Sequence, residues 1–283
     1  MDKPAGVTSH DVVARLRRVL GTKAVGHTGT LDPFATGLLV TLVGRATRLA
    51  RFVEGQPKTY RATLRLGVQT DTDDLTGSPV GGTVPDAWPA EAEVRTALEA
   101  MGGTQQQRPP AYSAKHVDGV RSHRLARRGV DVELAPVEVT IYAMELLAWR
   151  APDAEFRVTV SPGTYVRAIA RDVGQRLGTG AHLVSLRREA IGALQVEDAL
   201  PLDGIEGAMS LKPPLAVLPQ MRRVELDEAA LAYVQHGRAI VRPEGLEGGE
   251  GGEVAVALVQ GGELVAVAET RGDRLQPVVV LCG

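Results

Sequence analysis

Two strand-like runs in direct succession constrain the fold of this chain more than any other feature. Residues 137–150 (VEVTIYAMELLAWR) and 154–163 (AEFRVTVSPG) are rich in β-branched and aromatic residues, and a turn near Pro152 separates them. The next run, residues 163–178, has the pattern of a helix that ends at Gly178. Strands and helices alternate elsewhere without a regular βαβ order. We therefore expect an α+β fold with a mixed, mainly antiparallel sheet and flanking helices.

Three earlier elements fit this architecture: a helix over residues 8–20, a strand over 61–67, and a helix over 91–103. A stretch rich in proline and glycine, residues 200–222, then interrupts the pattern. Beyond it, residues 254–269 (VAVALVQGGELVAVAE) predict a hairpin, and a last strand follows. The predicted organisation is a main domain over residues 1–210, a linker over 211–221 and a small β-rich domain over 222–283.

The composition is that of an ordinary globular protein. Of 283 residues, 44% are apolar and 23% charged, and no apolar run approaches the roughly 18 residues that span a bilayer. The N-terminus shows no signal-peptide pattern, and the single cysteine, Cys282, has no partner for an internal disulfide. A reducing cytoplasm is the expected setting.

Charge is distributed unevenly, although the net charge is only −2. Residues 104–130 carry 6 basic residues against 1 acidic residue, with Tyr112 and two prolines among them. This composition suits a loop and short helix on a phosphate backbone, and a plain solvated loop explains it equally well. Arg127 of this stretch is a candidate substrate-binding residue.

The stretch GHTGTLDPFATGLL, residues 26–39, holds one acidic residue, Asp32, in a glycine-rich loop. Pro33 restricts Asp32 to extended conformations, and a carboxylate on such a rigid loop is a candidate nucleophile or general base. Local sequence alone favours the alternative that Asp32 caps a helix beginning near Pro33. His27 is a candidate base, or a residue that hydrogen-bonds its own loop.

Arg167 stands at the start of the helix predicted over residues 163–178. A positive charge there is unfavourable for the helix dipole, so it requires an anion to face. Asp32 is one candidate partner, and Asp172 is the alternative. Because a nearby cation lowers a carboxyl pKa, we expect Arg167 to keep Asp32 ionised.

Two further stretches hold candidate residues. Tyr60 begins a predicted strand, where its ring is placed either to stack on a nucleic-acid base or to lie half-buried. TDTDDLTG, residues 70–77, resembles part of a calcium loop but lacks the later glutamate. We interpret it as a turn rich in side-chain-to-backbone hydrogen bonds, in which Asp74 positions an arginine or a substrate hydroxyl.

Several motifs together are more specific than any one of them. KPAGVTSHDVV, GHTGTLDPFATGLL, TYRATLRLGVQTDTDD, RPPAYSA and GTYVRAIARDVGQRLGTGAHLVSLRR occur in one order and spacing. With them, nearly the whole chain resembles the bacterial tRNA pseudouridine-55 synthases, the TruB-type family. The resemblance implies an enzyme that flips one uridine out of the T-loop of tRNA and isomerises it to pseudouridine, with no metal and no organic cofactor.

The resemblance also implies residue roles. Asp32 matches the catalytic aspartate, and Arg167 matches the arginine that pairs with it. Tyr60 matches the active-site tyrosine, which packs against the target base and is proposed to act in proton transfer. His27 matches a histidine that holds flipped-out bases, and Asp74 matches an acid that organises the site.

Lys3, with Pro4 and Gly6, matches a structural motif near the catalytic loop, and we place Lys3 and Tyr165 among the candidate substrate-binding residues. The C-terminal β-rich piece is similar to a PUA domain, a small RNA-binding fold that touches the acceptor end of tRNA. The implied partner is therefore tRNA, through its T-arm and acceptor end. We expect a monomer with no obligatory protein partner and no membrane association.

The chain departs from the family pattern at three places. It begins at Met1 inside the DKP motif, where the family usually has an apolar strand first. His116 stands at the usual lysine of the motif YSAKHVDG, and His123 replaces an expected tyrosine. The acidic stretch 244–253 is unfavourable for phosphate contact, so we expect RNA to meet other faces of the last domain.

Other functions compete with this interpretation. A non-catalytic RNA-binding module would use the same fold without chemistry, but the presence of Asp32, Tyr60 and Arg167 together argues against it. A small-molecule hydrolase would use Asp32 as nucleophile, but the sequence has no glycine loop that cradles phosphate. Relatives that work within guide-RNA complexes are the nearest alternative, and the order of motifs favours the stand-alone bacterial type.

Overall fold

A computed structural model describes residues 1–113, 116–117, 120–122, 134–203, 205, 211–246 and 254–282. The chain divides into two compact units. Unit 1 contains residues 1–8, 31–38 and 55–200, and unit 2 contains residues 9–30, 39–54 and 201–283. The predicted boundaries at residues 210 and 222 stay predictions. No helix among the described residues is both long and apolar enough to cross a membrane.

An eight-stranded sheet forms the centre of unit 1. Its main path runs in the order β1-β3-β13-β5-β12-β11-β8, and β14 pairs with β13. All neighbours on this path are antiparallel except β13 and β3, which are parallel. The strands are β1 (Asp2–Lys3), β3 (Thr36–Leu38), β13 (Ala181–Ile191), β5 (Lys58–Leu66), β12 (Asp153–Val160), β11 (Val137–Arg150), β8 (Gly103–Gln107) and β14 (Leu194–Gln195). The predicted mixed, mainly antiparallel sheet is confirmed.

Alternating side chains give this sheet one apolar and one charged face. On β12, Phe156 and Val158 are fully buried, whereas Arg157 between them pairs with Glu189 of β13 at 2.8 Å. On β5, the exposed Arg65 makes two hydrogen bonds to the carboxylate of Asp153, at 2.7 and 2.8 Å. The period-two alternation thus separates the core from an open face of cross-strand ion pairs.

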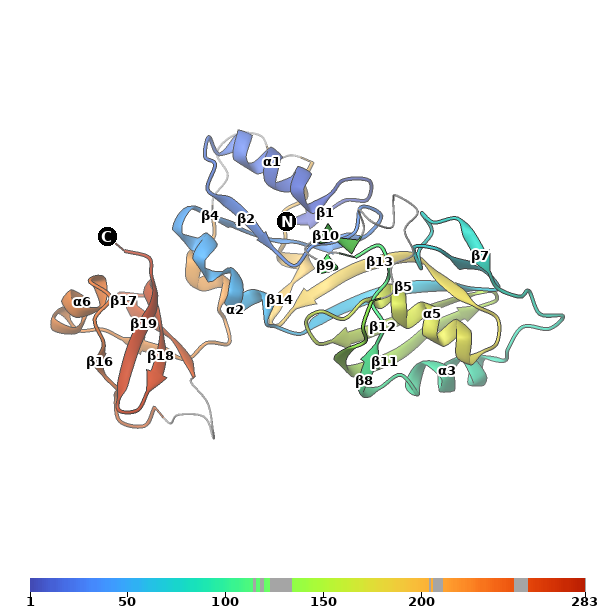
Figure 1. Cartoon of the computed structure of the whole chain (residues 1–283). Helices are drawn as coiled ribbons and strands as arrows, with labels where there is room; N and C mark the ends of the chain where they lie inside the picture. Colours follow the sequence, from blue (N-terminus) through green and yellow to red (C-terminus); the bar gives the residue numbers. More distant parts are fainter. Residues whose placement is uncertain are drawn as a thin grey trace. The chain divides into compact units, whose positions relative to one another are not determined.

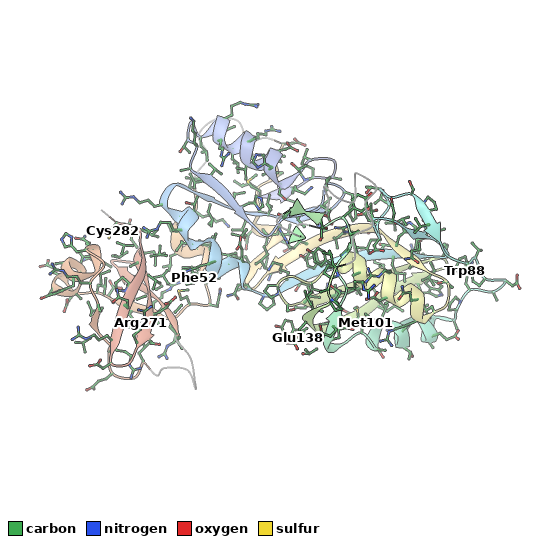
Figure 2. The ribbon with its side chains drawn as sticks, in the orientation of Figure 1. Phe52, Trp88, Met101, Glu138, Arg271 and Cys282 are labelled. Carbon is green, nitrogen blue, oxygen red and sulfur yellow. The ribbon has the colours of Figure 1, made fainter. Side chains whose placement is uncertain are left out.

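Two helices, α3 (Glu91–Glu99) and α5 (Val166–Arg176), cover the apolar face (Figure 1). Met101, labelled in Figure 2, follows α3 and is only 2% exposed. A Cβ at Gly174 of α5 would lie 2.3 Å from the backbone nitrogen of Ala181, so this glycine permits the close approach of α5 to the start of β13. Both helices were predicted from the sequence, and α5 holds Arg167 as its second residue.

Short elements complete unit 1 in the described ranges. They are β6 (Gln69–Thr70), β7 (Pro79–Gly81), β9 (His116–Val117), β10 (Val120–Arg121) and the 3-10 helix η2 (Val196–Asp198). The pair β6 and β7 brackets residues 71–78, which form the predicted turn. Asp74 lies in this turn and contacts Arg167 of α5.

Unit 2 combines an N-terminal part and a C-terminal part. The N-terminal elements are α1 (Ser9–Val19), β2 (Val25–Thr28), β4 (Val40–Val43), η1 (Gly44–Leu49) and α2 (Ala50–Glu54). The C-terminal elements are η3 (Pro214–Val217), β15 (Arg223–Glu225), α6 (Glu228–Gln235), β16 (Ile240–Val241), β17 (Ala255–Gln260), β18 (Glu263–Arg271) and β19 (Arg274–Val280). The predicted hairpin is β17 and β18, which turn at Gly261 and Gly262, both with positive φ.

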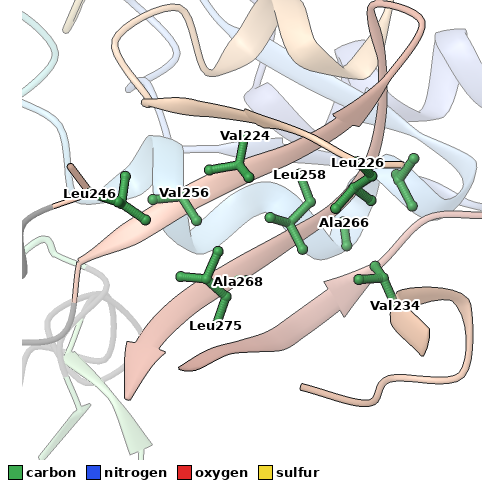
Figure 3. Packing of buried hydrophobic residues seen from close by; sticks show 10 residues of the cluster. Val224, Leu226, Val234, Leu246, Val256, Leu258, Ala266, Ala268 and Leu275 are labelled. Atoms are coloured by element: carbon green, nitrogen blue, oxygen red, sulfur yellow. The ribbon is translucent and has the colours of Figure 1, made fainter. Parts of the chain in front are cut away.

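The C-terminal strands form a five-stranded sheet in the order β15-β17-β18-β19-β16. Its core is a cluster of aliphatic side chains, shown in Figure 3. Val256, Leu258, Ala266 and Leu275 from the strands are fully buried in this cluster, together with Val234 of α6. A separate apolar core on a curled sheet confirms the predicted small β-rich, PUA-like fold.

Candidate active site

The loop that holds Asp32 is a tight turn. The backbone nitrogen of Ala35 donates to the carbonyl oxygen of Asp32 at 3.1 Å, and strand β3 begins at Thr36. The predicted helix near Pro33 is therefore wrong, because Pro33 occupies a turn position for which its fixed φ is equally suited. Leu31 and Ala35 are 3% and 0% exposed, so the two ends of the turn are anchored in the core.

Lys3 stabilises this turn through hydrogen bonds to backbone carbonyl oxygens. It is fully buried, and its ammonium group donates to the carbonyl oxygens of Val7 at 2.7 Å, Pro4 at 2.9 Å and Pro33 at 3.4 Å. The nitrogen of Gly6 donates to the same Pro33 oxygen at 2.8 Å. A buried ammonium needs such acceptors, and here they tie the N-terminal segment to the Asp32 turn. The predicted contact of Lys3 with the substrate is therefore wrong, because its side chain is enclosed by the protein.

Arg167 lies at the centre of the site and is 5% exposed. Its Nε donates to Asp32 Oδ2 at 2.9 Å, and Nη2 reaches Asp32 Oδ1 at 3.4 Å. Nη1 donates to the carbonyl oxygen of Thr72 at 2.8 Å, and Nη2 donates to that of Tyr112 at 2.9 Å. The predicted pairing of Arg167 with Asp32 is confirmed, and Asp172 pairs with Arg171 instead. These contacts fix the guanidinium plane, and with it the direction in which Asp32 points.

Asp74 flanks Arg167 on its other side, with Oδ2 at 3.5 Å from Nη1. Its Oδ1 accepts hydrogen bonds from the hydroxyl of Thr72 at 2.8 Å, and from the hydroxyl and backbone nitrogen of Thr76 at 2.6 and 2.9 Å. The hydroxyl of Thr70 donates to the carbonyl of Asp74 at 2.7 Å. The predicted turn of side-chain-to-backbone hydrogen bonds is confirmed, and so is an arginine as the partner of Asp74.

The electrostatics of Asp32 differ from the expectation. Its pKa lies above its ordinary value of 3.8, first because burial disfavours the charged carboxylate. Arg167 and Lys3 act in the opposite direction, and Asp74 adds to the increase. Arg167 thus lowers the pKa of Asp32 without cancelling the effect of burial. The Asp32 side chain is not fully enclosed, because 35% of it is exposed. The sequence offers the ion pair as one of two alternatives, but it does not indicate the surrounding protein that displaces water from Asp32.

Tyr165 adds an aromatic side chain beside this pair. Burial raises the pKa of Tyr165, a hydrogen bond with Ser113 lowers it, and the charges of Arg167 and Asp32 both act on the phenol. Gln107 holds the backbone of Tyr165 from both sides, with its Oε1 accepting from the nitrogen at 2.8 Å and its Nε2 donating to the oxygen at 3.1 Å. The sequence offered no signal for Gln107, which is one of three consecutive glutamines.

The other candidate residues lie as follows. Tyr60 is 7% exposed on β5, opposite Val158 and Arg188 of the neighbouring strands. The stacking role of Tyr60 stays a prediction. His27 belongs to unit 2 and is half-buried on β2, opposite Thr41 of β4. Arg127 and His123, like the side chain of His116, lie outside the described residues.

Comparisons with known proteins agree with this fold. The family described as TruB family pseudouridylate synthase (N terminal domain) matches residues 17–166. A protein of Gloeobacter violaceus named tRNA pseudouridine synthase B is 43% identical, and the alignment covers 99% of this chain and 97% of the relative. A protein of Thermobifida fusca with the same name is also 43% identical, over 100% of this chain and 97% of the relative.

Solved structures show the same architecture. A chain of the archaeal box H/ACA sRNP Nop10-Cbf5 complex matches with a TM-score of 0.72 and 25% identity, over 99% of this chain and 84% of the other. A chain of a Cbf5-Nop10-Gar1 complex matches with a TM-score of 0.71 and 26% identity, over 99% and 83%.

With these comparisons, the molecule, with its mixed sheet and its loop aspartate paired with a buried arginine, is placed among the enzymes that rearrange uridine in RNA. More narrowly, the chain belongs to the TruB family of pseudouridylate synthases.

Proposed function

We propose that this protein isomerises uridine to pseudouridine in tRNA, at position 55 of the T-loop. Uridine isomerisation in tRNA follows from membership of the family and from the name of its relatives. The observation that carries the assignment of the site is the 2.9 Å contact between Asp32 and the buried Arg167. The choice of position 55 rests on the order of the motifs along the chain.

The reaction needs a base that is turned out of the RNA. A uracil inside a folded loop is inaccessible, so the enzyme must hold it in a pocket, at a flipping cost of a few kcal/mol. The bond from C1′ of the ribose to N1 of the base then breaks, the base turns, and C1′ bonds to C5. The proton on C5 is released, and N1 takes up a proton. Asp32 is the group that acts on the nucleotide, as nucleophile at C1′ or C6 or as base at C2′.

The neighbouring residues support this chemistry. Arg167 holds the carboxylate of Asp32 in one orientation and stabilises its charge. Asp74 holds Arg167 from the opposite side, and Lys3 fixes the turn in which Asp32 lies. Tyr60 and Tyr165 offer ring faces against a base, and Tyr60 also relays a proton.

The role of His27 follows the resemblance, and that of Arg127 follows the basic composition of residues 104–130. His27 helps to hold the flipped bases, and Arg127 contacts the phosphate backbone. Both residues would contribute to the binding of tRNA and not to the chemical step. Their replacement should therefore lower the affinity for tRNA more than it lowers the rate of isomerisation in the bound complex.

The C-terminal sheet contributes a second surface for tRNA. A cavity of about 500 Å³ lies between α6, β15, β16 and β19, and Tyr233 and Arg274 are among the residues that line it. An aromatic ring with a cation beside it suits a base and its phosphate. We assign this part to the acceptor end of tRNA, while the T-arm meets unit 1.

Guide-RNA-dependent action is the alternative within this fold, because the solved structures that match are Cbf5 complexes. The curated relatives, at 43% identity, are named tRNA pseudouridine synthase B and favour tRNA as the substrate. We propose that the protein acts on it alone, as a monomer. Such a substrate also suits a cytoplasmic setting.

Mapping of pseudouridine in unmodified tRNA separates these possibilities. The purified protein alone should modify one uridine, at position 55, and a tRNA with cytidine at that position should stay unmodified. Product at another uridine would overturn the position, and strict dependence on an added guide RNA would favour the alternative.

A further inference from the structure

One helical turn beyond Arg167, a second arginine of α5 reaches the turn formed by residues 70–77. Arg171 Nη1 lies 3.0 Å from Asp73 Oδ2, and its Nη2 donates to the carbonyl oxygen of Arg108 at 2.9 Å. Only 13% of the Arg171 side chain and 8% of the Asp73 side chain are exposed. Burial of two charges in this way costs desolvation energy, so such a pair adds little to the stability of the fold by itself. The pair of Arg171 and Asp73 therefore contributes mainly by fixing the position of the chain segments that it joins.

The backbone of Asp73 is constrained as strongly as its side chain. Its φ of +59° lies in the left-handed region, and Asp73 is the one residue other than glycine with positive φ among those described. Its nitrogen donates to the carbonyl of Thr70 at 3.2 Å, and its carbonyl accepts from the nitrogen of Leu183 on β13 at 3.0 Å. Backbone of this kind is unfavourable for residues other than glycine, and it persists where the surrounding contacts hold it in place.

This constraint acts directly on the catalytic pair. Asp73 and Asp74 are adjacent, and their partners Arg171 and Arg167 lie four residues apart on the same face of α5. The left-handed residue at position 73 sets the direction in which the chain enters position 74. Asp74 then meets Nη1 of Arg167 at 3.5 Å, while Nε of Arg167 meets Asp32 at 2.9 Å.

We propose that Arg171 and Asp73 form a positioning pair for the isomerisation, which docks the turn of residues 70–77 onto α5 and so holds Asp74, Arg167 and Asp32 in alignment. Both residues act through Asp74 and Arg167. The proposal rests on the function proposed for Asp32, and the experiment below separates the two.

The test uses Asp73→Asn and Arg171→Gln. Asparagine tolerates the left-handed backbone and keeps the shape of Asp73, so the first variant removes only the charge. Single-turnover rates of pseudouridine formation should fall about ten- to a hundredfold in both variants, because small misplacements of catalytic groups have effects of this size. The dissociation constant for tRNA should stay within about twofold, since neither residue is assigned to RNA binding.

Arg65→Gln is the matched control. This substitution removes the two hydrogen bonds from Arg65 to the carboxylate of Asp153 on the open face of the same sheet. The single-turnover rate of the variant should equal that of the wild type. The double variant Asp73→Asn/Arg171→Gln should lose no more than the larger single loss, because the two residues act as one unit. Arg171→Lys keeps the charge and should recover part of the rate.

A wild-type rate in Asp73→Asn and Arg171→Gln would overturn the proposal, and so would an equal loss in Arg65→Gln or an effect confined to tRNA binding. If Arg171→Gln fails to fold, Asp73→Asn and Arg171→Lys give the same contrast. Asp32→Asn is measured alongside. Its inactivity together with full activity of Asp73→Asn overturns only the positioning pair, whereas activity of Asp32→Asn overturns the proposed function.

Discussion

Asp32 and Arg167 are separated by 135 positions in the sequence and meet through a contact of 2.9 Å between Oδ2 and Nε. The turn that holds Asp32 is tied to β1 and β3, whereas Arg167 belongs to α5, which packs on β13. Because β3 and β13 are neighbours in the sheet, a single layer positions both residues.

Replacement of Arg167 by lysine should abolish most of the activity although the charge remains. Lysine cannot contact Asp32, Thr72 and Tyr112 from one rigid plane as the guanidinium does. We expect the single-turnover rate to fall about a hundredfold or more, with a loss of about 2–4 kcal/mol in the free energy of unfolding. Tritium release from 5-tritiated uridine in tRNA and urea unfolding measure the two effects. An active Arg167→Lys would show that the geometry of this pair is not needed.

The rate should decline on the acid side at a pH above the ordinary range of aspartate. Asp32 has to be ionised to act as nucleophile or base, and burial raises its pKa above 3.8. Activity is therefore present above this raised pKa and is lost as the pH falls through it. A pH profile of the single-turnover rate checks the sign. A rate that stays constant down to pH 4 would contradict the assignment.

Asp73 should make the folded protein relatively more stable as the pH falls from about 6 towards 4. Burial raises its pKa to about 6, against the opposing charges of Arg171 and Arg167 and with a smaller contribution from Asp172. The folded state therefore binds the proton more tightly than the unfolded state in this window. The free energy of unfolding of the wild type should gain roughly 2–3 kcal/mol relative to Asp73→Asn between pH 7 and pH 4. Urea titrations of both proteins across this range measure the difference, and parallel curves would contradict the shift.

Gly37→Ala should destabilise the protein through a backbone clash. Gly37 has a φ of +102°, and a Cβ there would lie 2.3 Å from the carbonyl oxygen of Arg188 on β13. The expected loss is about 3 kcal/mol or more, because both the strain and the separation of β3 from β13 contribute. Gly163→Ala is the control, since Gly163 also has positive φ but open space around it, and it should lose only about 1 kcal/mol. Equal losses in the two variants would remove the clash as the cause.

The sequence predicts most of the long elements because their patterns are local. The runs that became β11, β12, α5 and the hairpin of β17 and β18 each have a period that matches one face of the fold. Asp32 illustrates the limit of this reasoning. Its Asp-Pro dipeptide fits a helix start and a turn equally well, and strand β3 at Thr36 decides between them through pairing with distant strands.

The candidate site was predictable as residue types but not as a network. The unfavourable position of Arg167 at a helix start indicated an anionic partner, and Asp32 was among the candidates. The hydrogen bonds of Arg167 to the carbonyl oxygens of Thr72 and Tyr112 involve backbone atoms, which carry no sequence signal. The increase in the pKa of Asp32 depends on burial by the assembled sheet, which no local pattern contains.

Pseudouridine formation by Asp32→Asn tests most directly whether the Asp32 carboxylate acts on the nucleotide. The wild type, Asp32→Asn and the control Arg65→Gln are incubated with unmodified tRNA, and both product and tRNA binding are measured. We expect no product from Asp32→Asn, tRNA binding close to that of the wild type, and full activity of Arg65→Gln. Product from Asp32→Asn at a rate comparable to the wild type, with mass spectrometry excluding deamidation back to aspartate, would contradict it.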